Sequence, residues 1–399
     1  MEWKEVRLGD VCNIITGFPF PGKKYSQKGV RVVRGDNVTI GNLRWDTEKD
    51  KRWNEPFDKT EYYSLQANDI VIGMDGSRVG KNKARIKEED LPLLLAQRVA
   101  CVRHNELAEQ DYLYYNIFSK KFIDYVNSIH TGSAIPHISQ KQIEDYKILL
   151  PDLGTQRRIA SILSSLDRKI ELNNKINADL EEMAQAIFKN WFVDFEPFKD
   201  GKFVDSELGM IPEGWKVGRL EDIAEITMGQ SPAGNSLNEN REGMMFYQGS
   251  SDFGFRFPSI RVFTTEPKRL AVANSVLFSV RAPVGDINVA KEECCIGRGV
   301  ASLKSKYGHD SYLFYTMKSL HKLFDSFDGE GTVFGSINKK TLSAIQILLP
   351  SDGIVEQFNS IASSFDNRIR SLSEENSRLS LLRDTLLPRL MSGELEIPE

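Results

Sequence analysis

The 399-residue sequence is poor in the residues that build metal centres and disulfide frameworks. It contains four cysteines and five histidines, and no two cysteines have the CxxC spacing of a metal or redox site. Cys12, Cys101, Cys294 and Cys295 also lack a metal-ligand spacing with the histidines. We therefore expect four reduced thiols, as is usual in a cytoplasm, and no bound metal.

Long apolar runs are missing as well. A membrane-spanning helix needs about 20 apolar residues, whereas the densest run, Leu91–Ala96, is short and broken by Pro92. The first 15 residues lack the pattern of a signal peptide, because Glu2, Glu5 and Asp10 interrupt them. The sequence thus predicts a cytoplasmic protein with no membrane partner.

An excess of positive charge is also absent. Acidic residues outnumber basic ones by 56 to 52, which gives a net charge of −4. The acidity lies mainly in two segments that we expect to be helical, while basic side chains gather in the first 100 residues. They are Lys23, Lys24, Lys28, Arg31 and Arg34, then Arg78, Lys81, Lys83, Arg85 and Lys87. Such clusters are either a solvated surface or a nucleic-acid contact.

Common catalytic motifs are not found. Gly76–Asn82 resembles a phosphate-binding loop only loosely, because Asp75 stands where glycine is needed and Asn82 replaces Ser or Thr. The sequence has no GxGxxG after a strand, no Gly-x-Ser-x-Gly, and no Pro-Pro-aromatic motif of the amino-methyltransferases. It therefore predicts a chain without catalysis of its own; an enzyme with a diverged site is one alternative.

The sequence does contain an internal repeat of two similar halves. The spacing between matched positions drifts from 212 to 199 residues while their order is preserved, as expected for related domains with insertions and deletions. The matches are Trp3, Arg7, Leu8 and Gly17 with Trp215, Arg219, Leu220 and Gly229; Val79 and Gly80 with Val284 and Gly285; Arg98, Tyr112, Leu113 and Tyr115 with Arg298, Tyr312, Leu313 and Tyr315; and Gly132, Ile138, Lys141, Ile148 and Pro151 with Gly331, Ile337, Lys340, Ile347 and Pro350.

Each copy predicts an α+β lobe followed by a long helix. Short apolar runs at 69–72, 99–102 and 275–278 indicate strands, and 112–126 and 312–324 have helical spacing. Ser139 with Gln142 forms a capping-box pattern, and Asn338 is the equivalent cap. We expect lobes at 1–151 and 196–350, and long helices at 152–195 and 351–399.

The two long segments have the 3.5-residue period of paired helices. The first series is Ile159, Leu163, Leu166, Ile170, Asn173, Asn177, Leu180, Ala184, Ile187 and Trp191; the second is Phe358, Ala362, Phe365, Ile369, Leu372, Asn376, Leu379, Leu382 and Leu386. Asn177 and Asn376 occupy matching positions. They are either tolerated polar residues near a frayed seam or a lock that fixes the register of the helices.

Several segments follow one another in order: Gly132–Gln140, Lys147–Pro151, Gln156–Ala160, Leu166–Asn173 and Ala186–Phe195, and then the ending Leu387–Leu395. Together they resemble the specificity subunit of a Type I restriction-modification system. The resemblance covers essentially the whole chain and is most specific in the helical segments. One departure is visible: Val355, not a glutamine, stands opposite Gln156, so the start of the second helix is expected to differ.

The resemblance implies that each lobe is a target-recognition domain for one half of a bipartite sequence in double-stranded DNA. The two helices would pack antiparallel as a spacer and give the lobes a pseudo-two-fold relation. Two methyltransferase subunits would bring S-adenosylmethionine, and restriction-motor subunits would bring ATP and Mg. This chain itself would bind no cofactor. A coiled-coil adaptor without DNA readout is the alternative from a different class.

Loops that contain glycine are the candidate DNA contacts, because binding residues concentrate on loops of a rigid scaffold. They could equally be plain turns. The candidates are Thr16, Gly17, Phe18, Lys23, Lys24, Ser77 and Arg78 in the first lobe, and Gly229, Gln230, Ser231, Asn235 and Arg281 in the second. For Gln97-Arg98 and Gly297-Arg298 we expect a structural salt bridge or cap. Trp191, Phe192 and Phe195 pack the helix end onto a lobe or dock a partner subunit.

Overall fold

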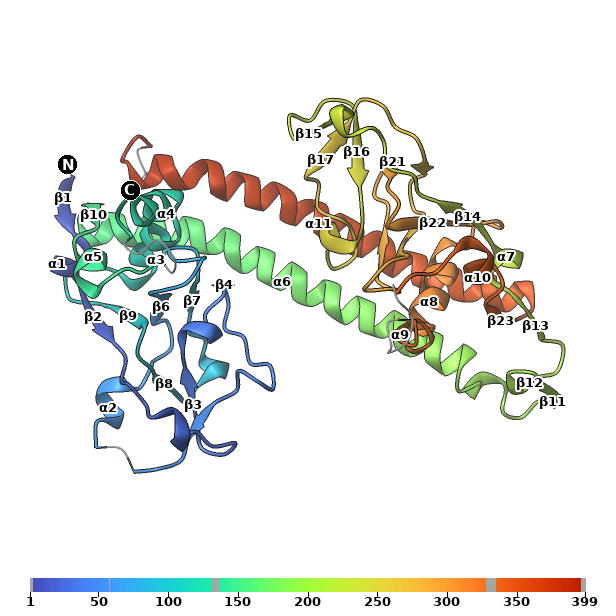
Figure 1. The fold of residues 1–399 in the computed structure, drawn as a ribbon, viewed down its shortest axis with the longest axis horizontal. Helices are drawn as coiled ribbons and strands as arrows, with labels where there is room; N and C mark the ends of the chain where they lie inside the picture. The colour runs from blue at the N-terminus through green and yellow to red at the C-terminus, as the bar shows by residue number, and fades with distance from the viewer. Residues whose placement is uncertain (1–2, 57, 131–135, 328–334, 396–399) are drawn as a thin grey trace. The chain divides into compact units, whose positions relative to one another are not determined.

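The computed structural model describes residues 3–56, 58–130, 136–327 and 335–395. The chain forms two compact units, unit 1 with Met1–Leu172 and Glu375–Glu399, and unit 2 with Asn173–Glu374. Each unit contains one α+β lobe and a part of each of two 40-residue helices, α6 (Leu153–Phe192) and α11 (Asp352–Met391), drawn green and red in Figure 1. The predicted fold class, two mixed lobes with two long helices, is confirmed. Of the repeat positions, Gly132 and Gly331 lie outside the described residues.

The lobe of unit 1 is built on two sheets. The first has the order β2 (Cys12–Thr16), β9 (Val99–His104), β6 (Ile70–Gly73), β7 (Lys83–Arg85) and β4 (Ile40–Gly41). The second has the order β5 (Arg52–Trp53), β3 (Val30–Val33) and β8 (Leu93–Leu95). Because strand side chains alternate between faces, Ile70 and Ile72 enter one hydrophobic cluster while Val71 enters another. The central strand is therefore buried on both sides.

The lobe of unit 2 repeats this plan. Its first sheet has the order β14 (Ala224–Met228), β22 (Val300–Ser305), β19 (Val276–Ser279) and β20 (Ile287–Val289). The second has the order β15 (Leu237–Asn238), β17 (Val262–Thr264), β16 (Met244–Tyr247), β21 (Cys294–Ile296) and β18 (Leu270–Ala271). A hairpin of β11 (Phe203–Ser206) and β12 (Gly209–Pro212) precedes the lobe.

The opening and closing strands of each lobe pair in the same register. In unit 1, β1 (Lys4–Arg7) runs antiparallel to β10 (Lys147–Leu150), with Lys4 opposite Leu150. In unit 2, β13 (Lys216–Arg219) runs antiparallel to β23 (Gln346–Leu349), with Lys216 opposite Leu349. The ends of each repeat are thus held together directly where the long helix begins.

Short helices cover the sheets, and one prediction about them was wrong. The segment 112–126 is not one helix but two, α3 (Gln110–Phe118) and α4 (Lys120–Ile129). Ser119 is extended and caps α4 by accepting from the Phe122 N–H, which ends the first helix. The equivalent segment is likewise split into α8 (Asp310–Ser319) and α9 (His321–Asp325). The other short helices are α1 (Leu8–Val11), α2 (Thr60–Tyr63), α5 (Gln140–Glu144), α7 (Leu220–Ile223) and α10 (Lys339–Ser343).

The predicted caps of α5 and α10 are confirmed. The Ser139 hydroxyl accepts from the Gln142 N–H at 3.2 Å, and the Gln142 side chain accepts from the Ser139 N–H at 2.8 Å. In the second lobe, the Asn338 side-chain oxygen accepts from the Thr341 N–H at 3.0 Å. Each cap satisfies a backbone donor that the helix itself cannot.

Within each unit, the long helices pair in opposite directions. In unit 1 the start of α6, with Ile159 and Leu163, packs with Leu390 near the end of α11. In unit 2 the end of α6, with Phe188 and Phe192, packs with Phe358 near the start of α11. The buried residues that the long helices contribute to these two clusters are Ile159, Leu163 and Leu390 in unit 1, and Ala184, Phe188, Phe192, Val355, Phe358 and Ala362 in unit 2.

The predicted seam is correct in outline and wrong at its ends. Leu382 is 47% exposed, so it does not belong to the seam. Phe188 and Phe192 are buried where the series predicted Ile187 and Trp191, which are only half-buried. The shift arises because the seam follows the 3.6-residue turn of a helix against a lobe rather than a strict 3.5-residue repeat.

The three asparagines of the predicted seam differ in burial. Asn173 and Asn177 are buried, with exposures of 0% and 3%. Asn376 is half-buried. A role for these residues in fixing the register stays a prediction.

The second long helix begins differently from the first, as the sequence indicated. Gln156 is 1% exposed; its side chain accepts from the Glu109 N–H at 2.9 Å and donates to the Leu107 and Pro151 carbonyls. Its counterpart, Val355, lies in the hydrophobic core of unit 2. The N–H at the start of α8 is instead capped one turn later in α11, where the Asn359 side chain accepts from Tyr312 at 3.2 Å.

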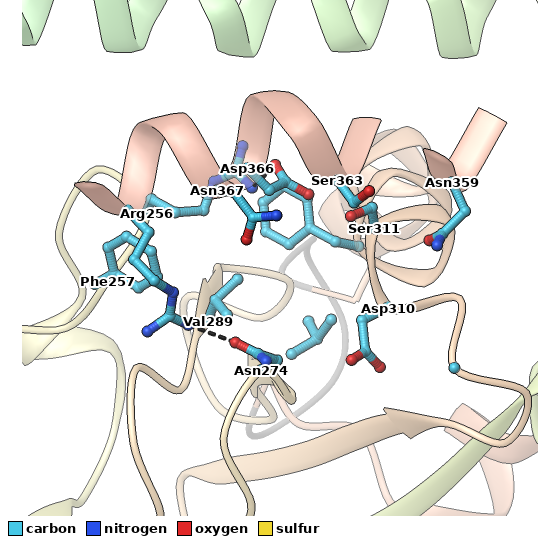
Figure 2. A pocket seen from close by; sticks show the side chains of 14 residues that line it. Arg256, Phe257, Asn274, Val289, Asp310, Ser311, Asn359, Ser363, Asp366 and Asn367 are labelled. Atoms are coloured by element: carbon cyan, nitrogen blue, oxygen red, sulfur yellow. Dashed lines mark hydrogen bonds and ion pairs between the residues drawn. The ribbon is translucent and has the colours of Figure 1, made fainter. Parts of the chain in front are cut away.

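A buried ion cluster fastens the second lobe to both long helices. Arg256, in the loop between β16 and β17, is 3% exposed and pairs with Glu181 of α6 and, at 2.6 Å, with Asp366 of α11. It also donates to the Tyr315 hydroxyl at 2.9 Å. Burial opposes the charged form, but the carboxylates of Asp366 and Glu181 raise the pKa of Arg256. A cavity of about 160 Å³ adjoins the cluster, and Asn359, Ser363 and Asp366 project toward it from α11 (Figure 2).

The first lobe is fastened by a related but more exposed cluster. Asp167 of α6 accepts from the Tyr115 hydroxyl at 2.7 Å and from Arg383 of α11 at 2.8 Å. Asp167 and Tyr115 are the counterparts of Asp366 and Tyr315. The arginine, however, comes from a helix in unit 1 and from a lobe loop in unit 2. Both Arg383 and Asp167 are 30% exposed, so this pair stays in contact with water.

Lys83 corrects the prediction for the second basic cluster. The cluster is expected to form a solvated surface or a nucleic-acid contact, but the Lys83 side chain points inward from β7 and is 3% exposed. The ammonium donates to the Gly80 carbonyl at 2.9 Å and lies 5.0 Å from the ring centre of Phe122. Burial lowers the pKa of Lys83 to about 7.

Lys83→Met is expected to change how stability depends on pH. An unfolded lysine keeps its proton to about pH 10, so between about pH 7 and pH 10 the unfolded chain binds more protons and wild-type stability rises with pH. The variant lacks that rise. Below pH 7 it should be more stable than wild type by about 1–3 kcal/mol, because the buried charge is gone while one hydrogen bond is lost. Urea unfolding from pH 6 to pH 10 measures this, with the exposed Lys81→Met as control; parallel curves for Lys83→Met and wild type would contradict it.

Candidate nucleic-acid interface

Four turns of the first lobe meet at one end of its sheets. Two of them contain the DNA contacts predicted from the sequence, and the other two lie beside these. The four turns are Thr16–Phe18, Arg34–Gly35, Asp75–Arg78 and Ala96–Arg98, and together we call them the turn face of the lobe. Gly17 donates to the Val99 carbonyl at 3.1 Å, Phe18 to Leu95 at 3.0 Å, and Met74 to Arg98 at 2.9 Å. The two loops that the sequence singled out are therefore brought together, and Gln97-Arg98 lies between them.

The second lobe has the same turn face, formed by Met228–Gln230, Gln248–Gly249, Arg281 and Gly297–Gly299. Gly229 donates to the Val300 carbonyl at 2.9 Å, Gln230 to Ile296 at 2.9 Å, and Val280 to Gly299 at 2.9 Å. The bridge between Asp75 and His137 in the first lobe recurs between Arg281 and Ser336. The two turn faces thus share these backbone hydrogen bonds, while the N–H of Gln97 donates to the Phe18 carbonyl and that of Arg298 to the Ser231 hydroxyl.

Glycine is required at the first turn of both faces. A Cβ on Gly17 would lie 2.2 Å from the Ala96 oxygen, and one on Gly229 would lie 2.1 Å from the Gly297 oxygen. Both approaches are to backbone atoms, which cannot rotate away. Glycine therefore recurs at positions 17 and 229 because in both lobes the chain passes close to the backbone of the adjacent turn.

These hydrogen bonds correct one match of the repeat. The sequence paired Arg98 with Arg298, but Val99 and Val300 take the same place in the sheets, so Arg98 corresponds to Gly299 and Gln97 to Arg298. The expected salt bridge at Arg98 is confirmed: its guanidinium lies 2.9 Å from Asp75. Side chains at matched positions of the two turn faces are consequently Arg34 and Gln248, Asp75 and Arg281, and Gln97 and Arg298.

The predicted contact residues of the first lobe lie on or beside this face. Lys23, Ser77 and Arg78 are exposed, and Lys24 is exposed but paired with Glu55 at 2.7 Å. Thr16 is half-buried, with its hydroxyl 3.5 Å from the Gln140 side chain. Phe18 is half-buried against Phe20 and Tyr63, so it supports the turn from within.

In the second lobe, Gln230, Asn235 and Arg281 are exposed. The Ser231 hydroxyl donates to the Gln248 side-chain oxygen at 2.9 Å and accepts from the Arg298 N–H at 3.3 Å. Sequence reasoning named Arg34 only as a member of a basic cluster, missed Gln248, and gave Gln97 and Arg298 only structural roles. Their common signal, a turn after each of two parallel strands, appears only when β3 and β8 are known to pair.

The aromatic residues at the end of α6 pack inside unit 2. Phe192 is 6% exposed and contacts Trp215, Tyr312 and Phe358 at ring-centre distances of 5.2–5.9 Å. Trp191 contacts Phe358, and Phe195 contacts Trp215. Their packing on the lobe is the first of the two expected roles; docking of a partner by these side chains stays a prediction.

Each unit has an apolar groove in the corresponding place. In unit 2, a groove of about 800 Å³ lies between the end of α6 and helices α8 and α9. In unit 1, a groove of about 560 Å³ lies between the end of α11 and helices α3 and α4. Four lining positions match at a spacing of 199 residues: Gln185, Phe188, Lys189 and Val193 with Asp384, Leu387, Pro388 and Ser392. Lysines border both grooves, Lys318 and Lys322 in one and Lys120 and Lys121 in the other.

Three further features can be stated for the part of the chain that the structure describes. It contains no cluster of three or more His, Cys, Asp or Glu side chains arranged for a metal ion. None of its helices combines the length and apolar character of a membrane span. The four cysteines are buried and unpaired with one another.

Comparison with known proteins places the chain in a family. It matches the type I restriction modification DNA specificity domain over residues 1–182 and again over 212–381. It is 35% identical to the MjaX specificity subunit of a type I restriction enzyme from Methanocaldococcus jannaschii, over 99% of this chain and 94% of that protein. The chain belongs to the specificity subunits of type I restriction-modification systems.

Other relatives agree with this assignment. The HindI specificity subunit of Haemophilus influenzae is 26% identical over 99% of this chain and 100% of that protein. The crystal structure of the S subunit from M. genitalium has a TM-score of 0.60 and covers 100% of this chain and 97% of its own. At 15% identity, that specificity subunit shows a likeness of fold.

Proposed function

We propose that this specificity subunit directs a DNA methyltransferase to a bipartite target, with each lobe reading a different half-site. One observation supports this most directly: the two turn faces share a backbone arrangement but carry different side chains. Sequence in DNA is read by side chains at base edges, whereas phosphate contacts only position the protein. A common scaffold with different side chains is suited to reading two different short sequences.

We also propose that two copies of one methyltransferase subunit dock on this chain, one in each apolar groove. The duplication of the groove supports two copies of the same partner, because matched residues of α6 and α11 line it. In both grooves the lining lysines outnumber the lining carboxylates by one, which favours a partner segment with apolar side chains and an acidic residue. The long helices would set the spacing of the half-sites.

The chemistry in this proposal belongs to the partners. Methyltransferase subunits would bind S-adenosylmethionine, and restriction-motor subunits would bind ATP and Mg; the specificity subunit would bind no cofactor and catalyse nothing by itself. Its net charge of −4 fits this division of labour. An acidic chain depends on partners to complete a positive clamp on DNA, so DNA binding should be weak for this chain alone and strongly salt-dependent for the complex.

Methylation profiling of a host with and without the gene tests the proposal. Adenine methylation should disappear at one motif made of two differently spelled parts with a fixed gap. Unchanged methylation at every motif would contradict the proposal and favour an adaptor that does not read DNA. Activity of the isolated chain without partners would instead support an enzyme.

A further inference from the structure

The residues that read bases can be assigned from the two turn faces, on the condition that the lobes read DNA as proposed. We propose that three matched positions carry the base contacts: Arg34, Asp75 and Gln97 in the first lobe, and Gln248, Arg281 and Arg298 in the second. At each position the preceding strand occupies the same place in the sheets of both lobes, whereas the side chain differs. These positions therefore distinguish one half-site from the other.

The backbone at these positions is held rigidly. Arg34 and Gln248 directly follow β3 and β16, and Gln97 and Arg298 lie in the turns after β8 and β21. Each pair of strands is parallel, so both turns leave the sheet at the same edge. The Ala96 N–H donates to Val33 at 2.9 Å, and the equivalent Gly297 N–H donates to Tyr247 at 2.8 Å. Residues on such strand ends are positioned more accurately than residues in mobile loops.

The side chains have the chemistry of base recognition. Arginine donates two hydrogen bonds to guanine O6 and N7, glutamine pairs with adenine N6 and N7, and aspartate accepts from cytosine N4. The first lobe presents arginine and glutamine where the second presents glutamine and arginine. The third position changes sign, from Asp75 to Arg281. The two lobes would thus reverse guanine and adenine preference at two matched positions.

The local geometry holds these groups at the surface, where Arg34 lies 3.7 Å from Asp36 and its side chain is 25% exposed. In the first lobe, Arg34, Asp75 and Gln97 line an open hollow of about 370 Å³, with Tyr25 and Phe20 on its wall. Arg98 pairs with Asp75 and fixes the carboxylate in place. In the second lobe, the Ser231 hydroxyl donates to the Gln248 side-chain oxygen at 2.9 Å. The amide nitrogen of Gln248 therefore points away from Ser231. A side chain on Gly297 would lie 2.6 Å from the same oxygen, so glycine makes room for Gln248.

Two reciprocal substitutions test the assignment. Arg298→Gln and Gln97→Arg are each co-expressed with the methyltransferase partner, and the methylated motif is read by sequencing. Arg298→Gln should shift one base pair of a single half-site from guanine toward adenine, and Gln97→Arg should shift one base pair of the other half-site from adenine toward guanine. The change in preference should be roughly tenfold to a hundredfold at that base pair, as for one bidentate contact.

The outcomes separate this assignment from the proposed function. Arg219→Gln, an exposed arginine on β13 that pairs with Glu221, should leave the motif unchanged. If wild type shows a bipartite motif and both variants keep it, the assignment is overturned while the function stands. A uniform loss of methylation, with an unchanged motif and intact co-purification, overturns it in favour of phosphate contacts. The absence of any bipartite motif in wild type contradicts the proposed function itself.

Discussion

Replacing Arg256 by methionine is expected to lower the free energy of unfolding of unit 2 by about 1–3 kcal/mol, because the buried Glu181 carboxylate keeps Lys318 as a partner but loses the guanidinium. Glu181 is 5% exposed, so water cannot replace the lost guanidinium. The aliphatic part of the arginine is largely reproduced by methionine, which restricts the change to the charge and its hydrogen bonds. Urea unfolding followed by circular dichroism measures the loss.

The first unit supplies a matched control for this prediction. Arg383→Met breaks the corresponding contact with Asp167, but both partners are 30% exposed. Ion pairs in contact with water contribute about 1 kcal/mol or less. Adding Glu181→Gln to Arg256→Met should restore part of the stability, since the buried charge is then removed while Lys318, whose side chain is 34% exposed, stays in contact with water. Equal losses in Arg256→Met and Arg383→Met would show that burial of the cluster does not govern its energy.

Arginine at the matched groove positions Val193 and Ser392 is expected to abolish assembly with the methyltransferase in two steps. Val193 is 51% exposed and Ser392 is exposed, so the substitutions should not disturb the fold. Each arginine adds bulk to one groove and places there a charge that is costly to bury. Each single variant should retain one methyltransferase subunit, and the double variant should retain none.

Native mass spectrometry of the co-purified complexes measures this stoichiometry. Met183→Arg, on an exposed position of α6 outside the groove lining, should keep the full complement. Val193→Ala and Ser392→Ala should do the same, because they neither fill the groove nor add charge. A double arginine variant that retains both partner subunits would place their docking elsewhere on the chain.

Much of the fold follows from patterns that are local in sequence. The apolar runs at 69–72 and 275–278 predict the central strands because both faces of each strand are buried. The long helices follow from sustained periodicity, and the caps at Ser139 and Asn338 follow from their residue types. The split of α3 from α4 escaped this reasoning, because the apolar spacing continues across Ser119 while the cap interrupts the backbone.

Features that depend on long-range pairing could not be predicted in this way. Arg256 reaches Glu181 and Asp366 across 75 and 110 residues, and nothing near it in sequence signals a buried charge. Lys83 lies in a run of basic residues whose other members face solvent or ion pairs.

The match of Arg98 with Arg298 failed for a related reason. The lobes differ by one residue between β9 and α3, so the correct spacing is 201 in the strands and 200 in the helices. The sequence comparison matched the two arginines because they are identical, although the register of the strands places them one residue apart. The error concealed the contrast between Gln97 and Arg298, on which the proposed base recognition depends.

Exchange of one lobe tests the central claim most directly. Residues 1–150 are replaced by the first lobe of another specificity subunit, and the methylated motif of the complex is sequenced. Because the two lobes are held to have separate half-sites, one half-site should change to that of the donor while the other half-site and the gap remain as they were. A change in both half-sites, or in neither, would contradict the account.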